Sequence, residues 1–215
     1  MKGMSNVLEH GIETVRADNF SYKGKWKSDY FQNEKPIVLE LACGKGEFAV
    51  AMSKIWPERN YVGVDIKGAR MYIGARQALD EELKNVAFLR TRIDFIESFF
   101  EVGEVDEIWI TFPDPQPQKN RARKRLTSPM FIDRYRKILK PGGIINLKTD
   151  SDFFYEYTKE QIEEHGYKTV IDLPEMYDQL AGLEDHLAAV LQTKTHYEKL
   201  FTEKGATIKF LQLSI

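Results

Sequence analysis

The sequence predicts an α/β protein with a doubly wound, mostly parallel sheet that carries helices on both faces. Short apolar runs alternate with amphipathic stretches from residue 36 onward, and turn or capping residues separate them. Such alternation is typical of parallel sheets whose strands are joined by helices. The chain has 215 residues, 42% of them hydrophobic and 30% charged, which is enough for one sizeable core.

The expected elements follow one another closely. Apolar runs predict strands at residues 37–42, 61–65, 86–90, 107–112 and 144–148. Amphipathic stretches predict helices at residues 47–55, 68–83, 95–100, 128–139 and 153–165. Pro57, the segment 141–143 and Gly166 end three of these helices, and Ser128 is a suitable N-cap. Two further strands are expected at 168–173 and 208–213, with a partly helical insert at 174–205.

Residues 1–35 differ in character from the domain predicted at 36–215. Their aromatic residues interleave with lysines: Phe20, Tyr22, Trp26, Tyr30 and Phe31 surround Lys23, Lys25 and Lys27. Aromatic rings between lysines can stack on bases while the lysines neutralise phosphates. They can equally pack on the sheet while the lysines stay solvated. Both interpretations of this arm are open from the sequence.

Composition narrows the class of protein. No apolar run approaches the length of a membrane span, and the first residues lack the apolar stretch of a signal peptide. Cys43 is the only cysteine, which excludes an intrachain disulfide and suits a reducing cytoplasm. The four histidines are scattered without metal-ligand spacing, so no metal site is expected.

A glycine turn joins the first predicted strand to the first helix. Gly44 and Gly46 permit a tight turn, and with Ala49 they match the weak fingerprint of dinucleotide sites. Glu40 lies just before this turn, where it would repel a pyrophosphate and attract a cationic ligand such as S-adenosylmethionine. Asp65, at the end of the second strand, can accept both hydroxyls of a ribose. A nicotinamide-dependent oxidoreductase remains the alternative, and the two acids would otherwise be helix caps.

The segment from Thr111 to Arg125 carries the second signal. Three prolines hold Asp114 in a stiff loop at the carboxyl end of a strand, where open α/β sheets place ligands. A cationic run follows, formed by Lys119, Arg121, Arg123, Lys124 and Arg125. Residues 119–140 contain nine Lys or Arg and one acid, against a net charge of −2 for the whole chain. This distribution predicts a polyanion bound at one face, unless the run is only a solvated loop.

The chain resembles the bacterial tRNA (guanine-N7)-methyltransferases over most of its length. The matching segments are Lys23–Trp26, the turn from Glu40 to Gly46, the Phe-Pro-Asp-Pro block with its basic tail, Leu147–Asp150 and Thr195–Phe201. The family has Trp and Lys where Gln116 and Gln118 stand. The resemblance implies a Rossmann-like methyltransferase sheet with a final antiparallel strand.

The resemblance also implies roles for individual residues. S-adenosylmethionine would be bound by Glu40, Gly44, Gly46, Asp65 and Arg92, with Asp94 as the alternative to Arg92 beside the adenine. Asp114 would contact both the cofactor and the guanine, as the catalytic residue. The residues implied to face tRNA are Gln118, Lys119, Arg121, Arg123, Lys124, Arg125, Asp150, Thr195 and Glu198, the last two in the insert 174–205. Asp150 could instead cap the helix that follows it.

The activity implied is methyl transfer from S-adenosylmethionine to N7 of a variable-loop guanosine in tRNA by a cytoplasmic monomer or homodimer. Because guanine N7 carries a lone pair and no proton, the reaction needs alignment and charge stabilisation, not a strong general base. A non-catalytic RNA-binding module is the third possibility. It would not need Glu40, Asp65 and Asp114.

Overall fold

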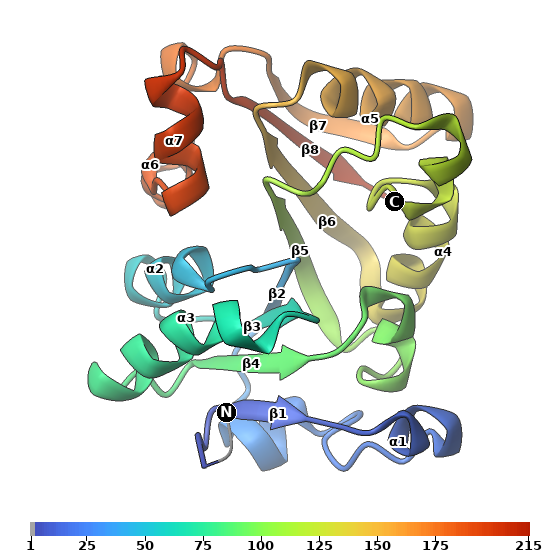
Figure 1. The fold of residues 1–215 in the computed structure, drawn as a ribbon, viewed down its shortest axis with the longest axis vertical. Helices are drawn as coiled ribbons and strands as arrows, with labels where there is room; N and C mark the ends of the chain where they lie inside the picture. The colour runs from blue at the N-terminus through green and yellow to red at the C-terminus, as the bar shows by residue number, and fades with distance from the viewer. Residues whose placement is uncertain (1–2) are drawn as a thin grey trace.

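A computed structural model describes residues 3–215, and its centre is an eight-stranded sheet. Figure 1 shows the strands crossing the molecule, in the order β1-β4-β3-β2-β5-β6-β8-β7. Only β8 runs against its neighbours in this sheet, so the mostly parallel sheet with a final antiparallel strand is confirmed. The strands are β1 (Val7–Glu9), β2 (Ile37–Leu41), β3 (Asn60–Asp65), β4 (Val86–Arg90), β5 (Val105–Thr111), β6 (Leu139–Thr149), β7 (Lys168–Leu173) and β8 (Lys209–Ser214).

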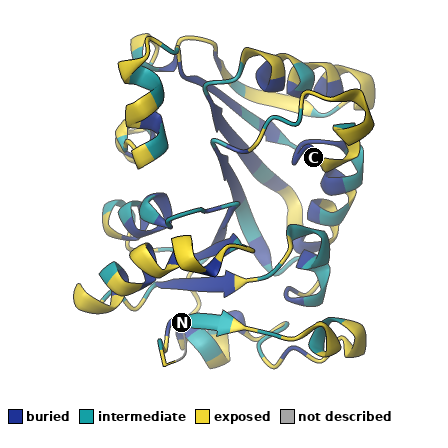
Figure 2. Ribbon diagram, in the orientation of Figure 1, coloured by how far each residue is buried: buried dark blue, intermediate teal, exposed yellow. Residues whose placement is uncertain are grey.

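Helices cover both faces of the sheet, as predicted. One face carries α2 (Glu47–Ile55), α3 (Gly68–Asp80) and α6 (Asp185–Gln192), whose Phe48, Ala75 and Val190 share one core. The other carries η2 (Ile93–Ser98), α4 (Pro129–Ile138) and α5 (Asp152–His165), with Tyr135 and Phe154 in a second core. The central strands are therefore buried between two helical layers, and the exposed residues lie mainly on the outer sides of the helices and on the edge strand β7 (Figure 2). Within residues 3–215, no helix is both long and apolar enough to cross a bilayer.

The N-terminal arm adds to the sheet instead of projecting from it. β1 pairs in parallel with β4, with Val7 opposite Phe88, and α1 (Ile12–Ala17) and η1 (Trp26–Phe31) follow it. Trp26 is fully buried, and its indole N–H donates a 2.8 Å hydrogen bond to the Phe99 carbonyl. Phe20 and Phe31 are buried beside it. For these three aromatic residues the packing interpretation is correct, and they are not available to stack on bases.

The carboxyl ends of the parallel strands lie at one edge of the sheet. At this edge the glycine turn between β2 and α2 packs against α3. The Gly74 amide donates a 2.8 Å hydrogen bond to the Lys45 carbonyl in that turn. A Cβ added at Gly74 would lie 2.6 Å from the same oxygen, which is closer than real Cβ contacts come. The small residue in α3 therefore lets the helix approach the turn closely enough to hold it.

We expect Gly74→Ala to destabilise the protein. In an ordinary helix interior this change is stabilising by about 0.5–1 kcal/mol. Here the overlap with the Lys45 carbonyl would force a backbone shift costing about 1–3 kcal/mol. Urea unfolding followed by circular dichroism measures the difference. An increase in the free energy of unfolding would show that the turn and α3 are not tightly packed.

Candidate active site

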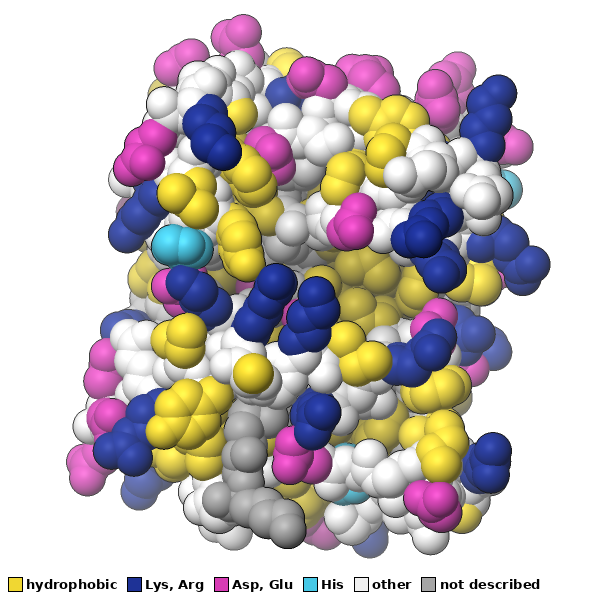
Figure 3. Space-filling view, viewed as in Figure 1, with side chains coloured by type: hydrophobic (Ala, Val, Ile, Leu, Met, Phe, Trp, Pro, Cys, Tyr) yellow, Lys and Arg dark blue, Asp and Glu magenta, His cyan; other side chains and the backbone are white. Residues whose placement is uncertain are grey.

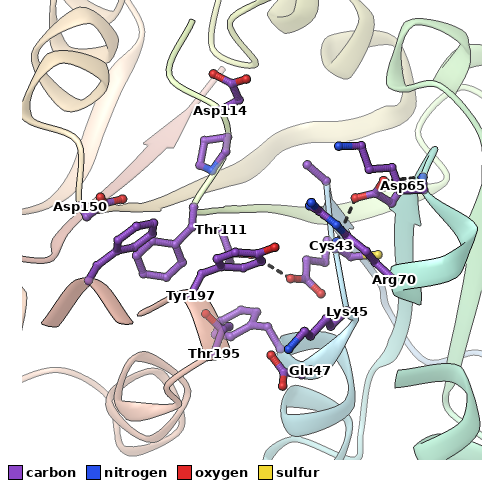
Figure 4. Close-up of a pocket in the computed structure, with 18 of the residues that line it drawn as sticks. Cys43, Lys45, Glu47, Asp65, Arg70, Thr111, Asp114, Asp150, Thr195 and Tyr197 are labelled. Carbon is purple, nitrogen blue, oxygen red and sulfur yellow. Dashed lines mark hydrogen bonds between the residues drawn. The ribbon is translucent and has the colours of Figure 1, made fainter. Parts of the chain in front are cut away.

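One pocket of about 560 Å³ opens at the carboxyl edge of the sheet. This volume lies within the range of small-molecule sites. Its walls come from the glycine turn, the ends of β3, β5 and β6, and α7 (His196–Glu203) (Figure 4). The residues predicted as site residues that line it are Glu40, Gly44, Asp65, Asp114, Asp150 and Thr195. Segments far apart in the sequence thus converge at one pocket.

Glu40 forms the floor of the pocket and is almost completely buried. One carboxylate oxygen accepts a 2.8 Å hydrogen bond from the Thr111 hydroxyl, and the other accepts a 3.0 Å bond from the Ala49 amide. Burial raises the pKa of Glu40 to about 8, although both hydrogen bonds oppose the shift. The carboxylate therefore joins β2 to the first turn of α2 and to the end of β5.

Asp65 and the glycine turn form a cradle suited to a nucleoside. Asp65 accepts hydrogen bonds from the amides of Gly44, at 2.9 Å, and Lys67, at 2.7 Å. A carboxylate has about four acceptor sites, so two remain for the hydroxyls of a ribose. Gly46 has a φ of 72°, and a Cβ there would lie 2.3 Å from the Phe88 ring, so the turn can only be made this tight with glycine. These residues fit adenosylmethionine.

Asp114 lies in a loop that leaves β5 through a sharp turn. Phe112 and Gln116 have positive φ values of 48° and 47°, in the left-handed region that side chains rarely adopt. The Phe112 amide donates to the Lys148 carbonyl at 2.8 Å, and Asp114 accepts a 3.1 Å bond from the Gln116 amide. Asp114 is exposed and lines the pocket at the edge opposite the glycine turn, with its carboxylate directed outward (Figure 4). The loop is thus held, and among residues 3–215 one oxygen of the Asp114 carboxylate has no partner.

The basic run divides into two kinds of residue. Arg125 is buried, and its guanidinium donates hydrogen bonds to the carbonyls of Gln116, at 3.1 Å, and Pro117, at 3.4 Å. It also lies over the rings of Tyr157 and Phe153, 4.3 and 4.7 Å from their centroids. Arg125 therefore braces the loop of Asp114. The exposed members are Lys119, Arg121, Arg123 and Lys124, all in the short helix η3 (Lys119–Lys124), which is preceded by the exposed Gln118.

Asp150 follows β6 and faces the pocket from the side opposite Asp65 (Figure 4). The N-cap of α5 is Ser151, whose hydroxyl accepts a 3.2 Å hydrogen bond from the Phe154 amide. Asp150 is therefore not needed as the cap. Partial burial raises the pKa of its carboxyl above the ordinary value. Its side chain remains available to hydrogen-bond donors on a ligand.

The insert 174–205 is fastened to the sheet by a buried ion pair. Lys148 of β6 and Glu198 of α7 are fully buried and 2.9 Å apart. Lys148 also donates to the carbonyls of Leu191 and Thr193, at 2.7 and 3.0 Å, and the Tyr177 hydroxyl donates to Glu198. Glu198 thus has its partners inside the protein and does not line the pocket.

Thr195 begins α7 and does reach the pocket. Its hydroxyl accepts a 3.2 Å bond from the Glu198 amide, while Glu198 accepts from the Thr195 amide, which is a capping box. The next amide, of His196, donates a 2.9 Å bond to Glu47 at the start of α2. Glu198 therefore acts on the site through Thr195 and the position of α7.

Arg92 lies outside this pocket. It lines a neighbouring hollow of about 290 Å³ together with Ile66, which is exposed, and residues of the N-terminal arm. Its guanidinium forms an exposed 2.6 Å ion pair with Asp94. Arg92 and Asp94 were the two alternatives for the residue beside the adenine. In the structure they form an ion pair with each other.

Several pocket residues were not predicted as site residues. They include Lys45, Lys67 and Arg70 on the glycine-turn side, and Phe112, Tyr197 and Phe201 on the other. The Phe112 and Phe201 rings lie 6.0 Å apart and give the pocket an aromatic wall. Tyr197 and Phe201 stand one turn apart on α7, a spacing visible in the sequence once the helix start at Thr195 is recognised. The three cations are scattered in sequence and leave no such signal.

Comparison with known proteins identifies the family. The model of the family described as "Putative methyltransferase" matches residues 34–211. A tRNA (guanine-N(7)-)-methyltransferase from Bacteroides fragilis is 46% identical over 99% of this chain and 81% of its own length. The enzyme of that name from Porphyromonas gingivalis is 47% identical, over 100% of this chain and 86% of its own. The chain belongs to the tRNA (guanine-N(7)-)-methyltransferase family.

Solved structures support the fold of this tRNA (guanine-N(7)-)-methyltransferase family member. A 16S rRNA (adenine(1408)-N(1))-methyltransferase from Catenulisporales acidiphilia superposes with a TM-score of 0.60 at 18% identity, covering 89% of this chain and 92% of that one. The sheet is therefore of the Rossmann-like methyltransferase type. Within residues 3–215, no group of three or more His, Cys, Asp or Glu is placed to hold a metal ion.

The buried Glu40 predicts a pH-dependent difference between the protein and its Glu40→Gln variant. A raised pKa in the folded state means that the neutral acid stabilises the fold, and that this contribution is lost as pH rises from the unfolded value toward about 8. Glutamine cannot ionise, so the variant should become progressively more stable relative to wild type between about pH 5 and pH 8.5. Urea unfolding at several pH values tests this. A difference that stays constant with pH would contradict the buried, proton-binding state of Glu40.

The ion pair between Lys148 and Glu198 should behave as a coupled unit. Removing one partner leaves an uncompensated buried charge, so Lys148→Met or Glu198→Gln alone should cost about 3–5 kcal/mol. The double variant should cost less than the sum of the two because it leaves no unpaired charge. A double-mutant cycle by urea unfolding at neutral pH gives the coupling energy. Additive costs would mean that the pair does not hold α7 to the sheet.

Proposed function

We propose that this protein transfers a methyl group from S-adenosylmethionine to N7 of a variable-loop guanosine in tRNA. One observation carries the proposal: a single pocket joins a nucleoside cradle, formed by Gly44 and Asp65, to the carboxylates of Asp114 and Asp150. A cofactor and a base bound in such a pocket would meet between the two sets of groups. The names of the curated relatives support guanine N7 as the acceptor.

Adenosylmethionine would supply the methyl group as an electrophile on a positively charged sulfur. The protein's task is to hold that carbon in line with N7, and positioning of this kind can supply about 7–11 kcal/mol of a barrier. The cradle of Asp65 and the glycine turn fixes the cofactor side. The stiff loop of Asp114, braced by Arg125, fixes the substrate side.

Asp114 and Asp150 are the groups that would recognise guanine. Its N1–H and exocyclic amine are neighbouring donors that only guanine presents together, and carboxylates only accept while ionised. Among residues 3–215, Asp114 keeps one oxygen without a protein partner, and Asp150 lines the same pocket. Their negative charge also stabilises the positive charge that develops on the ring during methylation. Asp114 is accordingly the catalytic residue we propose, with Asp150 in support.

The exposed part of the basic run supplies the grip on RNA. Lys119, Arg121, Arg123 and Lys124 project beside the loop of Asp114 without an ion pair among residues 3–215. Contacts to phosphates position a nucleic acid without reading its sequence. A cytoplasmic location and a monomeric or dimeric state remain parts of this proposal. Hydride transfer with a nicotinamide is disfavoured because the matching family and the curated relatives are methyltransferases.

Incubation of unmodified tRNA with the protein and adenosylmethionine tests the proposal, and nucleoside mass spectrometry reads it out. We expect 7-methylguanosine from the wild type. Asp114→Asn keeps the size of the side chain but places a donor against the donors of guanine. Its single-turnover rate should fall about 10²–10³-fold, by analogy with the loss of one transition-state hydrogen-bonding group. Its affinity for tRNA should remain close to that of wild type because phosphate contacts dominate binding.

The outcomes separate the parts of the proposal. No 7-methylguanosine from the wild type would overturn the reaction, and another methylated base would overturn the acceptor. A fully active Asp114→Asn would remove Asp114 from the catalytic role. Glu175→Gln, an exposed acid away from the pocket, is the matched control and should react at the wild-type rate.

A further inference from the structure

Three cations line the pocket on the side of the glycine turn. Lys45 comes from the turn itself, and Lys67 and Arg70 come from the beginning of α3. Lys67 and Arg70 are exposed. In the part of the chain that the structure describes, none of the three makes an ion pair. Cations that the fold neither pairs nor buries are free to bind an anion from outside.

These cations lie across the pocket from the loop of Asp114. Figure 4 shows Lys45 and Arg70 on one side of the pocket and Asp114 on the other. The exposed basic run, Lys119 to Lys124, continues outward from the Asp114 loop. On the face seen in Figure 3, Lys and Arg side chains gather on both sides of the central hollow. The pocket therefore opens between two cationic banks: the first bank is Lys119, Arg121, Arg123 and Lys124, and the second is Lys45, Lys67 and Arg70.

A base that enters a pocket from an RNA strand has a phosphate on each side of it. When the base is splayed out, the backbone runs across the mouth of the pocket, so the two flanking phosphates leave in opposite directions. The first bank can hold the backbone on one side only. A second cationic group on the other side would hold the strand at both ends of the extruded nucleotide and keep the base in place.

We propose that Lys67 and Arg70, with Lys45 behind them, form a second phosphate-binding site for the RNA strand that crosses the pocket. This inference rests on the proposed function, because it assumes that the pocket receives a base of a nucleic acid. The competing ligand for these cations is the carboxylate of a bound cofactor. Lys67 and Arg70 are exposed, whereas Asp65 and Gly44 of the cradle are partly buried, which favours a phosphate outside the pocket.

Arg70 also lies 5.9 Å from the ring of Tyr197 on α7, at the rim of the same pocket. This contact spans the pocket from α3 to the insert. An aromatic ring beside a cation can accept a stacked base while the cation holds the adjacent phosphate. The second bank and α7 therefore offer one continuous surface to the strand.

The test compares two double variants with the same change of charge. Lys67→Gln/Arg70→Gln alters the second bank, and Arg76→Gln/Lys84→Gln alters exposed residues of α3 and the loop after it that do not line the pocket. Filter binding gives the affinity for unmodified tRNA at several salt concentrations. For the bank variant we expect the slope of log affinity against log salt to fall by about 1.4–1.8, which is 0.7–0.9 for each lost phosphate contact. Adding Lys45→Gln should lower it further. The control should keep the wild-type slope.

Calorimetry with adenosylhomocysteine completes the design, and the bank variant should bind it as the wild type does. An unchanged salt slope, or an equal fall in the control, would overturn the second phosphate site. A loss of adenosylhomocysteine affinity with an unchanged slope would assign these cations to the cofactor and overturn it as well. Failure of the proposed function is distinct, because it appears as absence of 7-methylguanosine from the wild type whatever the slopes.

Discussion

The buried carboxylate of Glu40 connects the two halves of the site. It lies at the end of β2, accepts from the first turn of α2 through Ala49, and accepts from Thr111 where β5 ends. Thr111 is followed directly by the turn at Phe112 and then by Asp114. Burying a carboxylate is unfavourable unless its oxygens are satisfied, so these two bonds are needed for the fold itself. The spacing between the nucleoside cradle and the catalytic loop is therefore a consequence of how the core is stabilised.

The insert depends on a second buried charge in the same way. Lys148 can remain inside the protein because Glu198 and the carbonyls of the insert surround its ammonium. A helix of eight residues has little stability of its own, so α7 needs these contacts and its capping box to form. Glu47 adds a tie from the glycine turn to the His196 amide. The glycine turn, the loop of Asp114 and the insert are thus connected by hydrogen bonds and an ion pair around one pocket.

The sequence predicted the central parallel strands well because β2, β3 and β4 are runs of buried residues bounded by turns. It missed β1, since three residues, two of them partly buried and one exposed, leave no periodic signal, and their pairing with β4 depends on tertiary contact. The pocket acids at strand ends were predictable from position alone.

Glu198 was not predicted as buried, because the resemblance suggested a substrate contact. The Thr195-x-x-Glu198 pattern is nevertheless a readable capping box. The burial of Arg125 was not predicted either. In the sequence it is one member of a charge run, and its aromatic partners are brought to it only by the fold.

Charge in this protein has to be assessed by position and not by composition. The net charge of −2 suggests no affinity for RNA, and the basic run suggests one binding face. Folding changes both inferences: Arg125 is withdrawn into the structure, while Lys67 and Arg70 are brought to the rim of the pocket that holds Asp114. Coulomb interactions between exposed groups are screened within about 10 Å at ordinary salt, so distant acids do little to cancel these cations. The field that a polyanion meets at the pocket is therefore set by the residues around it, where Lys45, Lys67 and Arg70 stand together with the acids that line the same pocket.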